Sequence, residues 1–196
     1  ITYEEFEKKG YFVVPTAPDW EKYPVGMSKF LEDPESNPLK TPSGKIELVS
    51  PQAHERWGAD ELPTYTANTE RPDTEGTARY PLQLLTPNTK NRIHSQFGNL
   101  PTIRGLDPET FAEMSPVDAA ARGVVDGGRI RVFNDRGNME LVVRLDHSLR
   151  PGCLVIHNGW WLSEGGGVNL LSAARETDMG HGAAFHDNAV EVEPVG

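Results

Sequence analysis

Prolines divide the first third of this chain into pieces too short for a long helix or a central strand. Nine of the 16 prolines lie in residues 1–75, and seven of these fall between positions 15 and 51. Proline lacks a backbone donor and restricts the residue before it, so helix interiors and central strands tolerate it poorly. We therefore expect residues 16–42 to form an extended strap. Residues 61–77, rich in Pro, Thr and Glu, are expected to form a linker.

Within residues 1–75 the sequence predicts only short elements. Thr2 and Glu5 have the spacing of a capping box, and Gly10 can end the helix that they begin. Apolar residues at 11–14 predict one short strand, and residues 45–50 predict another that follows a turn. We place the domain boundary after residue 75, so that residues 76–196 form a separate, compact domain.

Residues 76–196 have the short segments of a mainly β domain with α decoration. Strands are expected at 81–86, 129–133, 139–145, 153–156 and 189–192. Residues 134–137 join two of them as a hairpin turn. A helix over 115–123 is expected because Ser115 can cap it, Pro116 suits its first position and Gly123 can stop it. Six or so short strands with one helix favour a small closed barrel over a parallel sheet.

The segment 79–105 is cationic in an otherwise acidic chain. It holds four basic residues and no acid, whereas residues 1–75 carry 8 basic against 15 acidic residues and residues 106–196 carry 7 against 14. Such a segment, following an apolar strand, predicts a loop that binds a small anion. The net charge of −10 argues against nucleic acid as the main partner. No apolar run approaches the ~20 residues of a bilayer span, so we expect no direct membrane insertion.

Other chemistries have weak support in the sequence. Cys153 is the only cysteine, which excludes an internal disulfide. With His157, His181 and His186 it faintly resembles a zinc-binding pattern, but the residues come from different segments and we expect no metal site. The chain lacks the motifs GxSxG, HExxH, GxxxxGK[ST] and GxGxxG, and no pair of carboxylates is marked out as catalytic. We predict no catalytic residue.

Six segments in fixed order carry a family resemblance. They include TPSGKIELVS at 41–50, PLQLLTPNTKNRIHSQF at 81–97, LRPGCLVIHNGWW at 149–161 and GVNLLSAARETD at 167–178, with further matches at 115–137 and 185–195. Together they resemble the C-terminal dinucleotide-binding domain of molybdopterin oxidoreductases of the dimethyl sulfoxide reductase family. The resemblance implies a six-stranded double-psi β-barrel of the aspartate-decarboxylase-like type. It also implies that the barrel closes over a bis(molybdopterin guanine dinucleotide) cofactor carrying molybdenum or tungsten.

The resemblance carries twelve residues over as cofactor contacts. They are Thr86, Asn88, Lys90, Arg92, His94, Ser95, Gln96, Trp160, Trp161, Asn169, Leu170 and His181. Their chemistry suits a pterin dinucleotide, because cations and backbone N–H groups bind a diphosphate and polar side chains pair with heterocycle edges. Aromatic side chains provide plates for the heterocycle faces.

Each of these groups also has a structural interpretation. The basic pair at 90 and 92 could form a solvated face, His94 could be a hydrogen-bonded structural residue, and the tryptophan pair could be core or interface aromatics. Asn169 could cap a short helix, and the glycines at 165–167 could simply form a flexible loop. All of them fall in two loops, one cationic and one glycine-rich and aromatic, and this coincidence favours a binding site.

We therefore expect a cofactor-binding domain of a larger molybdenum or tungsten oxidoreductase, one that transfers two electrons or an oxygen atom, as in anaerobic respiration. Alone, the domain is expected to be inactive, because the metal–pterin unit performs the chemistry. The resemblance implies upstream domains of the same polypeptide, which supply the metal ligand, and allows an iron–sulfur electron-transfer subunit. A start at Ile1 suggests a processed product or part of a longer protein, so the compartment stays open. The alternative is a cofactor-free β-barrel protein-interaction module.

Overall fold

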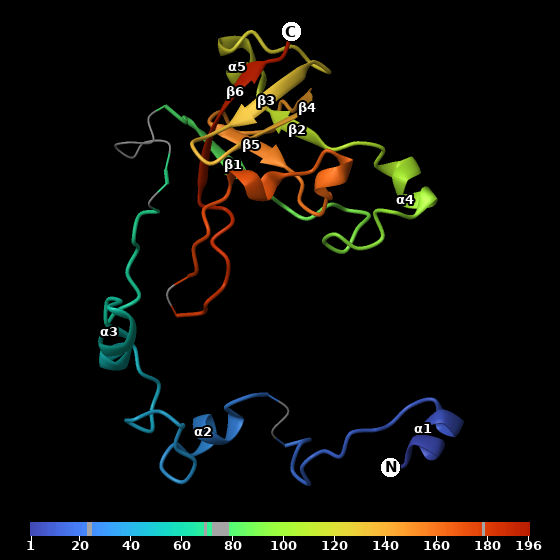
Figure 1. Cartoon of the computed structure of the whole chain (residues 1–196). Helices are drawn as coiled ribbons and strands as arrows, with labels where there is room; N and C mark the ends of the chain where they lie inside the picture. The colour runs from blue at the N-terminus through green and yellow to red at the C-terminus, as the bar shows by residue number, and fades with distance from the viewer. Residues whose placement is uncertain (23–24, 69, 72–78, 178) are drawn as a thin grey trace. The chain divides into compact units, whose positions relative to one another are not determined.

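The computed structural model describes residues 1–22, 25–68, 70–71, 79–177 and 179–196 (Figure 1). The chain divides into two units, Ile1–Pro63 and Thr64–Gly196, and each is described by itself. The boundary expected after residue 75 lies among residues 72–78, outside the described residues.

The first unit contains three short helices, α1 (Tyr3–Lys9), α2 (Ser28–Glu32) and α3 (Pro51–Trp57). The capping box of Thr2 and Glu5 is confirmed, and Gly10 ends α1 with a φ of 76°. The strands predicted at 11–14 and 45–50 are wrong, since neither segment is β structure. An isolated strand has no neighbour to satisfy its backbone groups, so apolar composition alone does not create one.

Helices in this unit occur where proline permits them. Residues 16–42 are not uniformly extended, because α2 fits into the proline-free stretch between positions 24 and 34. Helix α3 was not predicted, although its sequence contains a capping residue, a proline in the first turn and a glycine at its end. Ser50 accepts a hydrogen bond from the Ala53 amide, Pro51 occupies the first turn, and Gly58 ends the helix with a φ of 65°.

The second unit is built on a closed six-stranded barrel, which confirms the expected architecture (Figure 1). Its strands are β1 (Leu82–Leu85), β2 (Phe111–Met114), β3 (Arg129–Phe133), β4 (Asn138–Leu145), β5 (Cys153–Ile156) and β6 (Asn188–Pro194). They pair in the order β1-β5-β2-β4-β3-β6. The β1–β5 and β2–β4 pairs are parallel and the others are antiparallel. The finer double-psi connection stays a prediction.

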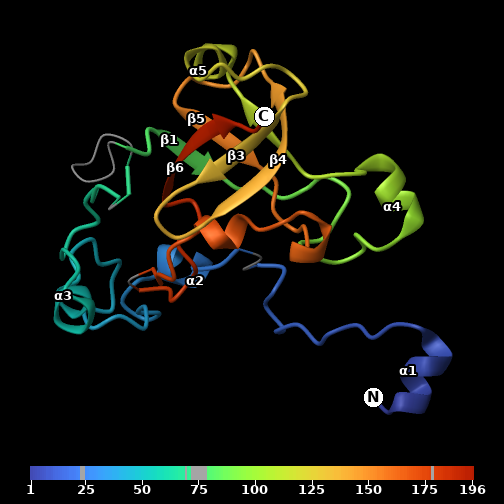
Figure 2. The ribbon, with the colours of Figure 1, turned by 45° about the horizontal axis from the view of Figure 1, so that its top comes forward.

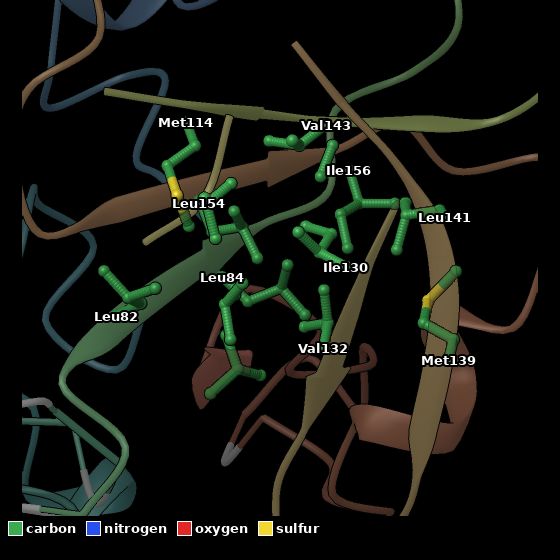
Figure 3. Packing of buried hydrophobic residues seen from close by; sticks show 14 of the residues in the cluster. Leu82, Leu84, Met114, Ile130, Val132, Met139, Leu141, Val143, Leu154 and Ile156 are labelled. Atoms are coloured by element: carbon green, nitrogen blue, oxygen red, sulfur yellow. The ribbon is translucent and has the colours of Figure 1, made fainter. Parts of the chain in front are cut away.

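Alternating side chains of the strands fill the barrel interior (Figure 3). In β1 the leucines at 82 and 84 are buried, and in β3 Ile130 and Val132 are buried while their neighbours are more exposed. Met114, Leu141, Val143, Leu154 and Ile156 meet them from the other strands. Burying each such side chain stabilises the fold by about 1.5–3 kcal/mol.

Short helices and turns connect the strands of the barrel. Helix α5 (Pro116–Ala121) is confirmed, with Ser115 accepting from the Asp118 amide as its cap. Three further turns were not predicted: α4 (Pro101–Leu106), η1 (Leu162–Glu164) and η2 (Val168–Leu171). In both ribbon views the orange turns η1 and η2 lie at the end of the barrel opposite α5 (Figures 1 and 2).

An ion pair between buried Glu70 and partly exposed Arg136 links the start of the second unit to the barrel. Arg136 donates from Nη1 and Nη2 to the two carboxylate oxygens of Glu70, each at 2.8 Å, and also to the Leu171 carbonyl. Glu70 is buried, and Arg175 lies 3.8 Å from it. This bidentate pair explains why a residue upstream of position 75 packs with the barrel.

Candidate functional site

Strand direction brings three loops to one edge of the barrel. Because β1 and β5 are parallel neighbours, the loops that follow them, 86–97 and 157–168, begin side by side. Strand β6 runs antiparallel to β1, with Asn188 opposite Leu84, so the residues just before β6 reach the same edge. Polar residues that are distant in sequence therefore meet where β1 and β5 end.

Hydrogen bonds from Asn158 and its neighbours join the first two loops. Asn158 Nδ2 donates to the Thr86 carbonyl and to Asn88 Oδ1, each at 3.0 Å. Thr89 Oγ1 donates to the Asn158 carbonyl at 2.6 Å, and Trp161 Nε1 donates to the Ser95 carbonyl at 2.9 Å. The two loops therefore form one continuous surface at this edge of the barrel, which we call the wall.

Gly159 lets the two loops come this close. Its φ is 90°, and a Cβ added there would lie 2.2 Å from the His94 carbonyl oxygen. His94 itself has a φ of 51°, uncommon for a residue other than glycine. Only glycine combines this backbone conformation with the absence of a side chain, so the wall depends on it.

A cavity of about 600 Å³ opens between the loops. It is lined by Thr86, Pro87, Asn88, His94, Ser95, Asn158, Gly159, Trp160, Val168, Asn169, Ser172, Ala183, Phe185 and His186. Six of the twelve predicted contacts are among them, and His94 and Asn169 share one cavity. None of its lining residues is Lys, Arg, Asp or Glu.

The cavity wall offers hydrogen-bonding groups and aromatic plates rather than charge. Asn158 Oδ1 is buried and has no hydrogen-bond partner among the described residues. A buried acceptor of this kind is stabilised when a ligand donates to it. Trp160 and Phe185 present aromatic surface beside these polar groups. Such a wall fits a flat, neutral heterocycle with donors and acceptors around its edge.

Sequence reasoning missed the side of the cavity next to β6. His186 and Phe185 line it, with ring centroids 4.4 Å apart, and the Thr86 amide donates to His186 Nδ1 at 3.4 Å. Gln83 on β1 holds the His186 carbonyl at 2.7 Å. The segment 185–195 was part of the family resemblance, so its first two residues could have been considered.

Arg92 lies outside this cavity. Its side chain is 1% exposed, its guanidinium carbon stacks 3.7 Å from the Trp160 ring centroid, and Nη1 is 3.5 Å from Glu164 Oε2. The structural interpretation of Arg92 as part of a solvated face is therefore wrong. Trp160 lines both the cavity and the pocket that contains Arg92.

Carboxylates from elsewhere in the chain pair with the other arginines of the cationic segment. Arg104 pairs with Glu164, and Arg79 pairs with Asp135. The Tyr80 hydroxyl also donates to Asp135, at 2.9 Å. Burial, and then this hydrogen bond, raise the pKa of Tyr80 above its usual 10.0. Two carboxylates, Asp135 and Glu164, therefore balance about half of the charge of the segment once the chain folds.

The remaining predicted contacts do not line the cavity. Lys90 and Gln96 are exposed, and Trp161 lines the pocket of Arg92. Leu170 borders a smaller pocket of about 210 Å³, and exposed His181 lies 2.9 Å from Glu176. A role in cofactor binding stays a prediction for all five of these residues and for Arg92. Asn169 is not a helix cap, because Gly167 precedes η2.

Among the described residues, no helix has the length and apolarity that crossing a bilayer requires. In the same part of the chain, no three His, Cys, Asp or Glu side chains gather in a way that could hold a metal ion.

Comparison with known proteins identifies a family model and several related proteins. Residues 82–189 match the family model of the molydopterin dinucleotide binding domain. The chain is 33% identical over 210 residues to dimethyl sulfoxide reductase DmsA of Escherichia coli, covering 99% of this chain and 25% of that protein. It is 36% identical over 181 residues to the dimethyl sulfoxide/trimethylamine N-oxide reductase of Rhodobacter capsulatus, covering 83% of this chain and 21% of that protein.

A solved structure shares the fold. Acetylene hydratase from Pelobacter acetylenicus superposes with a TM-score of 0.75 at 23% identity, covering all of this chain and 28% of that protein. The chain thus spans about a quarter of the length of its relatives. With more than half of its residues matched by the family model, the chain belongs to the molydopterin dinucleotide binding domain family.

Proposed function

We propose that this chain is the cofactor-binding domain of a larger molybdenum or tungsten oxidoreductase. Its cavity would hold the pterin portion of a molybdopterin guanine dinucleotide. The single observation that supports this best is the 600 Å³ cavity, where hydrogen-bonding side chains and aromatic rings meet at the ends of two parallel strands. The family membership agrees with this proposal.

Each side chain in the cavity would have a simple role. Thr86, Ser95 and Asn169 would pair with donors and acceptors at the heterocycle edge, and the orphan Asn158 Oδ1 would accept from an N–H of the ring. The indole of Trp160 would cover part of the ring surface. The bound cofactor supplies the redox chemistry, while these residues orient it and exclude water.

The cavity does not favour the diphosphate part of the dinucleotide. No lysine or arginine lines it, and a diphosphate needs cations or free backbone N–H groups. Arg92, one of the predicted cofactor contacts, lines a different pocket from His94. The diphosphate would lie outside the cavity, and the neutral heterocycle inside it.

The activity of the parent enzyme is proposed from its relatives. Two relatives are named as reductases of dimethyl sulfoxide, one of them also of trimethylamine N-oxide. By that likeness, the parent would remove an oxygen atom from a small organic oxide by two-electron transfer. Upstream domains of the same polypeptide would complete the cofactor site, and an iron–sulfur subunit would deliver electrons.

Nuclear magnetic resonance of the chain tests the cofactor proposal with two separate probes. Neopterin represents the heterocycle, and pyrophosphate represents the diphosphate. We expect neopterin to shift the resonances of His94, Asn169 and the Trp160 indole, whereas pyrophosphate leaves them unchanged. Replacing Asn169 with Ala should weaken the neopterin response, and replacing Asn37 of the first unit with Ala should not. If neopterin shifts none of these resonances, the result favours the cofactor-free β-barrel protein-interaction module instead.

A further inference from the structure

A second pocket beside Trp160 lies outside the cavity that we propose for the pterin. Its volume is about 300 Å³, and it is lined by Arg92, Asn99, Arg104, Pro108, Trp160, Trp161, Ser163 and Glu164. We call the 600 Å³ cavity the neutral cavity, because no Lys, Arg, Asp or Glu lines it. This second pocket, in contrast, contains three charged side chains. We call it the arginine pocket.

Arg92 is the unusual residue of the arginine pocket. Its side chain is 1% exposed, and its nitrogens Nε, Nη1 and Nη2 have no hydrogen-bond partner among the described residues. The 3.5 Å separation from Glu164 Oε2 is longer than a normal N–H···O hydrogen bond, and that oxygen is itself unpartnered. Buried charged donors are costly to leave unpaired, so a polar ligand at this position would be stabilising.

The charges of the lining residues indicate the charge of that ligand. Two guanidinium groups face one carboxylate, because Arg104 binds Glu164 through Oε1. Among the lining residues one positive charge is therefore left without a matching negative charge. A monoanion balances it, whereas a dianion would exceed it and approach the Glu164 carboxylate.

We propose that the arginine pocket binds a single carboxylate group, held by Arg92 and Arg104. A planar guanidinium fork matches a planar carboxylate in shape as well as in charge. Asn99 and Ser163 add neutral polar groups to the same wall. The carboxylate belongs either to a small free acid or to an Asp or Glu side chain of another polypeptide segment.

Gly98 gives the Arg92 guanidinium the room it occupies. A Cβ at position 98 would lie 2.1 Å from Arg92 Nη1, so any larger residue would displace the guanidinium. Trp160 covers one side of the group by stacking. The donors of Arg92 are therefore held in place before a ligand arrives, which lowers the entropy cost of binding.

Titration of the ¹⁵N-arginine-labelled chain with acetate tests the assignment. The Nε–H resonance of Arg92, identified by the Arg92→Lys variant, is followed at constant pH and ionic strength against sodium chloride. We expect a saturable shift of Arg92 with millimolar acetate and no shift of exposed Arg150. N-acetylaspartate N-methylamide serves as a second probe. Binding of acetate alone indicates a free acid, and binding of both indicates that a side-chain carboxylate also fits.

Three variants sharpen the test. Arg104→Gln should weaken acetate binding by about tenfold or more, since one of the two positive charges is lost. Glu164→Gln should strengthen it several-fold, because the net positive charge of the pocket rises. Arg150→Gln is the matched control and should change nothing. Circular dichroism of each variant establishes that the barrel is folded.

Two results would overturn the assignment. One is the absence of a saturable Arg92 shift with either carboxylate, and the other is an equal shift with chloride at the same ionic strength. Neither result bears on the cofactor proposal, which is measured with neopterin at His94 and Asn169. The acetate titration at Arg92 and the neopterin titration at the neutral cavity can therefore fail independently of each other.

Discussion

The neutral cavity and the arginine pocket share Trp160 but differ in how their polar groups are satisfied. The cavity has uncharged donors and acceptors from three loops, while the arginine pocket has two guanidinium groups and one carboxylate. The cationic segment of the sequence contributes to both, yet its buried charge goes only to the second. A cluster of basic residues in the sequence therefore does not identify the neutral cavity. Folding can bring acidic residues next to the basic ones, as Glu164 shows at Arg92 and Arg104.

Gly159→Ala should have the largest effect, since it breaks the wall of the neutral cavity. The new Cβ would meet the His94 carbonyl in a backbone conformation of φ 90°, so we expect a loss of about 3 kcal/mol in the free energy of unfolding. Urea denaturation measures it. Gly152→Ala is the control, because its φ is 87° but nothing lies near its Cβ, and it should cost only about 1 kcal/mol. Equal costs would mean that the contact with His94 is unimportant.

Glu164→Gln should come second, because it removes the only negative charge that faces Arg92 in the arginine pocket. Arg92 is buried, so losing this partner should lower the free energy of unfolding by about 2 kcal/mol. Arg104→Gln is the comparison. Arg104 is 55% exposed, and water would replace its partner at a cost of about 0.5 kcal/mol. If both variants unfold at the same urea concentration, the difference in burial between Arg92 and Arg104 has no effect on stability.

Trp160→Phe tests the wall that the two pockets share. The smaller ring should weaken stacking with Arg92 and cost about 1 kcal/mol. Titrations should show weaker responses to both neopterin and acetate. Trp20→Phe, at an exposed position in the first unit, is the control and should affect neither probe. A response lost for one probe alone would show that Trp160 serves only one pocket.

The smallest expected effect concerns Tyr80, which follows the first arginine of the cationic segment. Asp135→Asn should lower the pKa of Tyr80 toward 10.0, because the hydrogen bond to a charged carboxylate is lost. A pKa raised by folding stabilises the protein below pH 10.0, and this contribution disappears as the pH rises through the raised value. Ultraviolet titration of the phenolate measures the change. A titration identical in both proteins would show that Asp135 does not influence Tyr80.

Much of the barrel could be predicted from local pattern. Alternating residues gave β3 and β4, the turn at 134–137 joined them, and Ser115 with Pro116 marked α5. Strand β2 was not predicted because Ala112 and Glu113 have low β propensity; its pairing with β4 and β5 stabilises it. The segment 45–50 looked equally strand-like but has no such partners.

Half of the predicted contacts meet in one cavity, because strand pairing brings their loops together. Polar residues of the two loops were identified from the family resemblance, and parallel pairing of β1 with β5 brings their loops together. His186 was missed because only the antiparallel course of β6 returns it to that edge. Arg92 was predicted together with His94 from the family resemblance, although their side chains line different pockets.

Hydrophobic alternation and the residues that end helices and strands predict five of the six barrel strands, the caps of α1 and α5, and two polar loops. Which charges stay unpaired depends on the tertiary structure alone. Electrostatic balance depends on distance in space, and Glu164 reaches Arg92 and Arg104 through the closure of the barrel rather than through the chain between them.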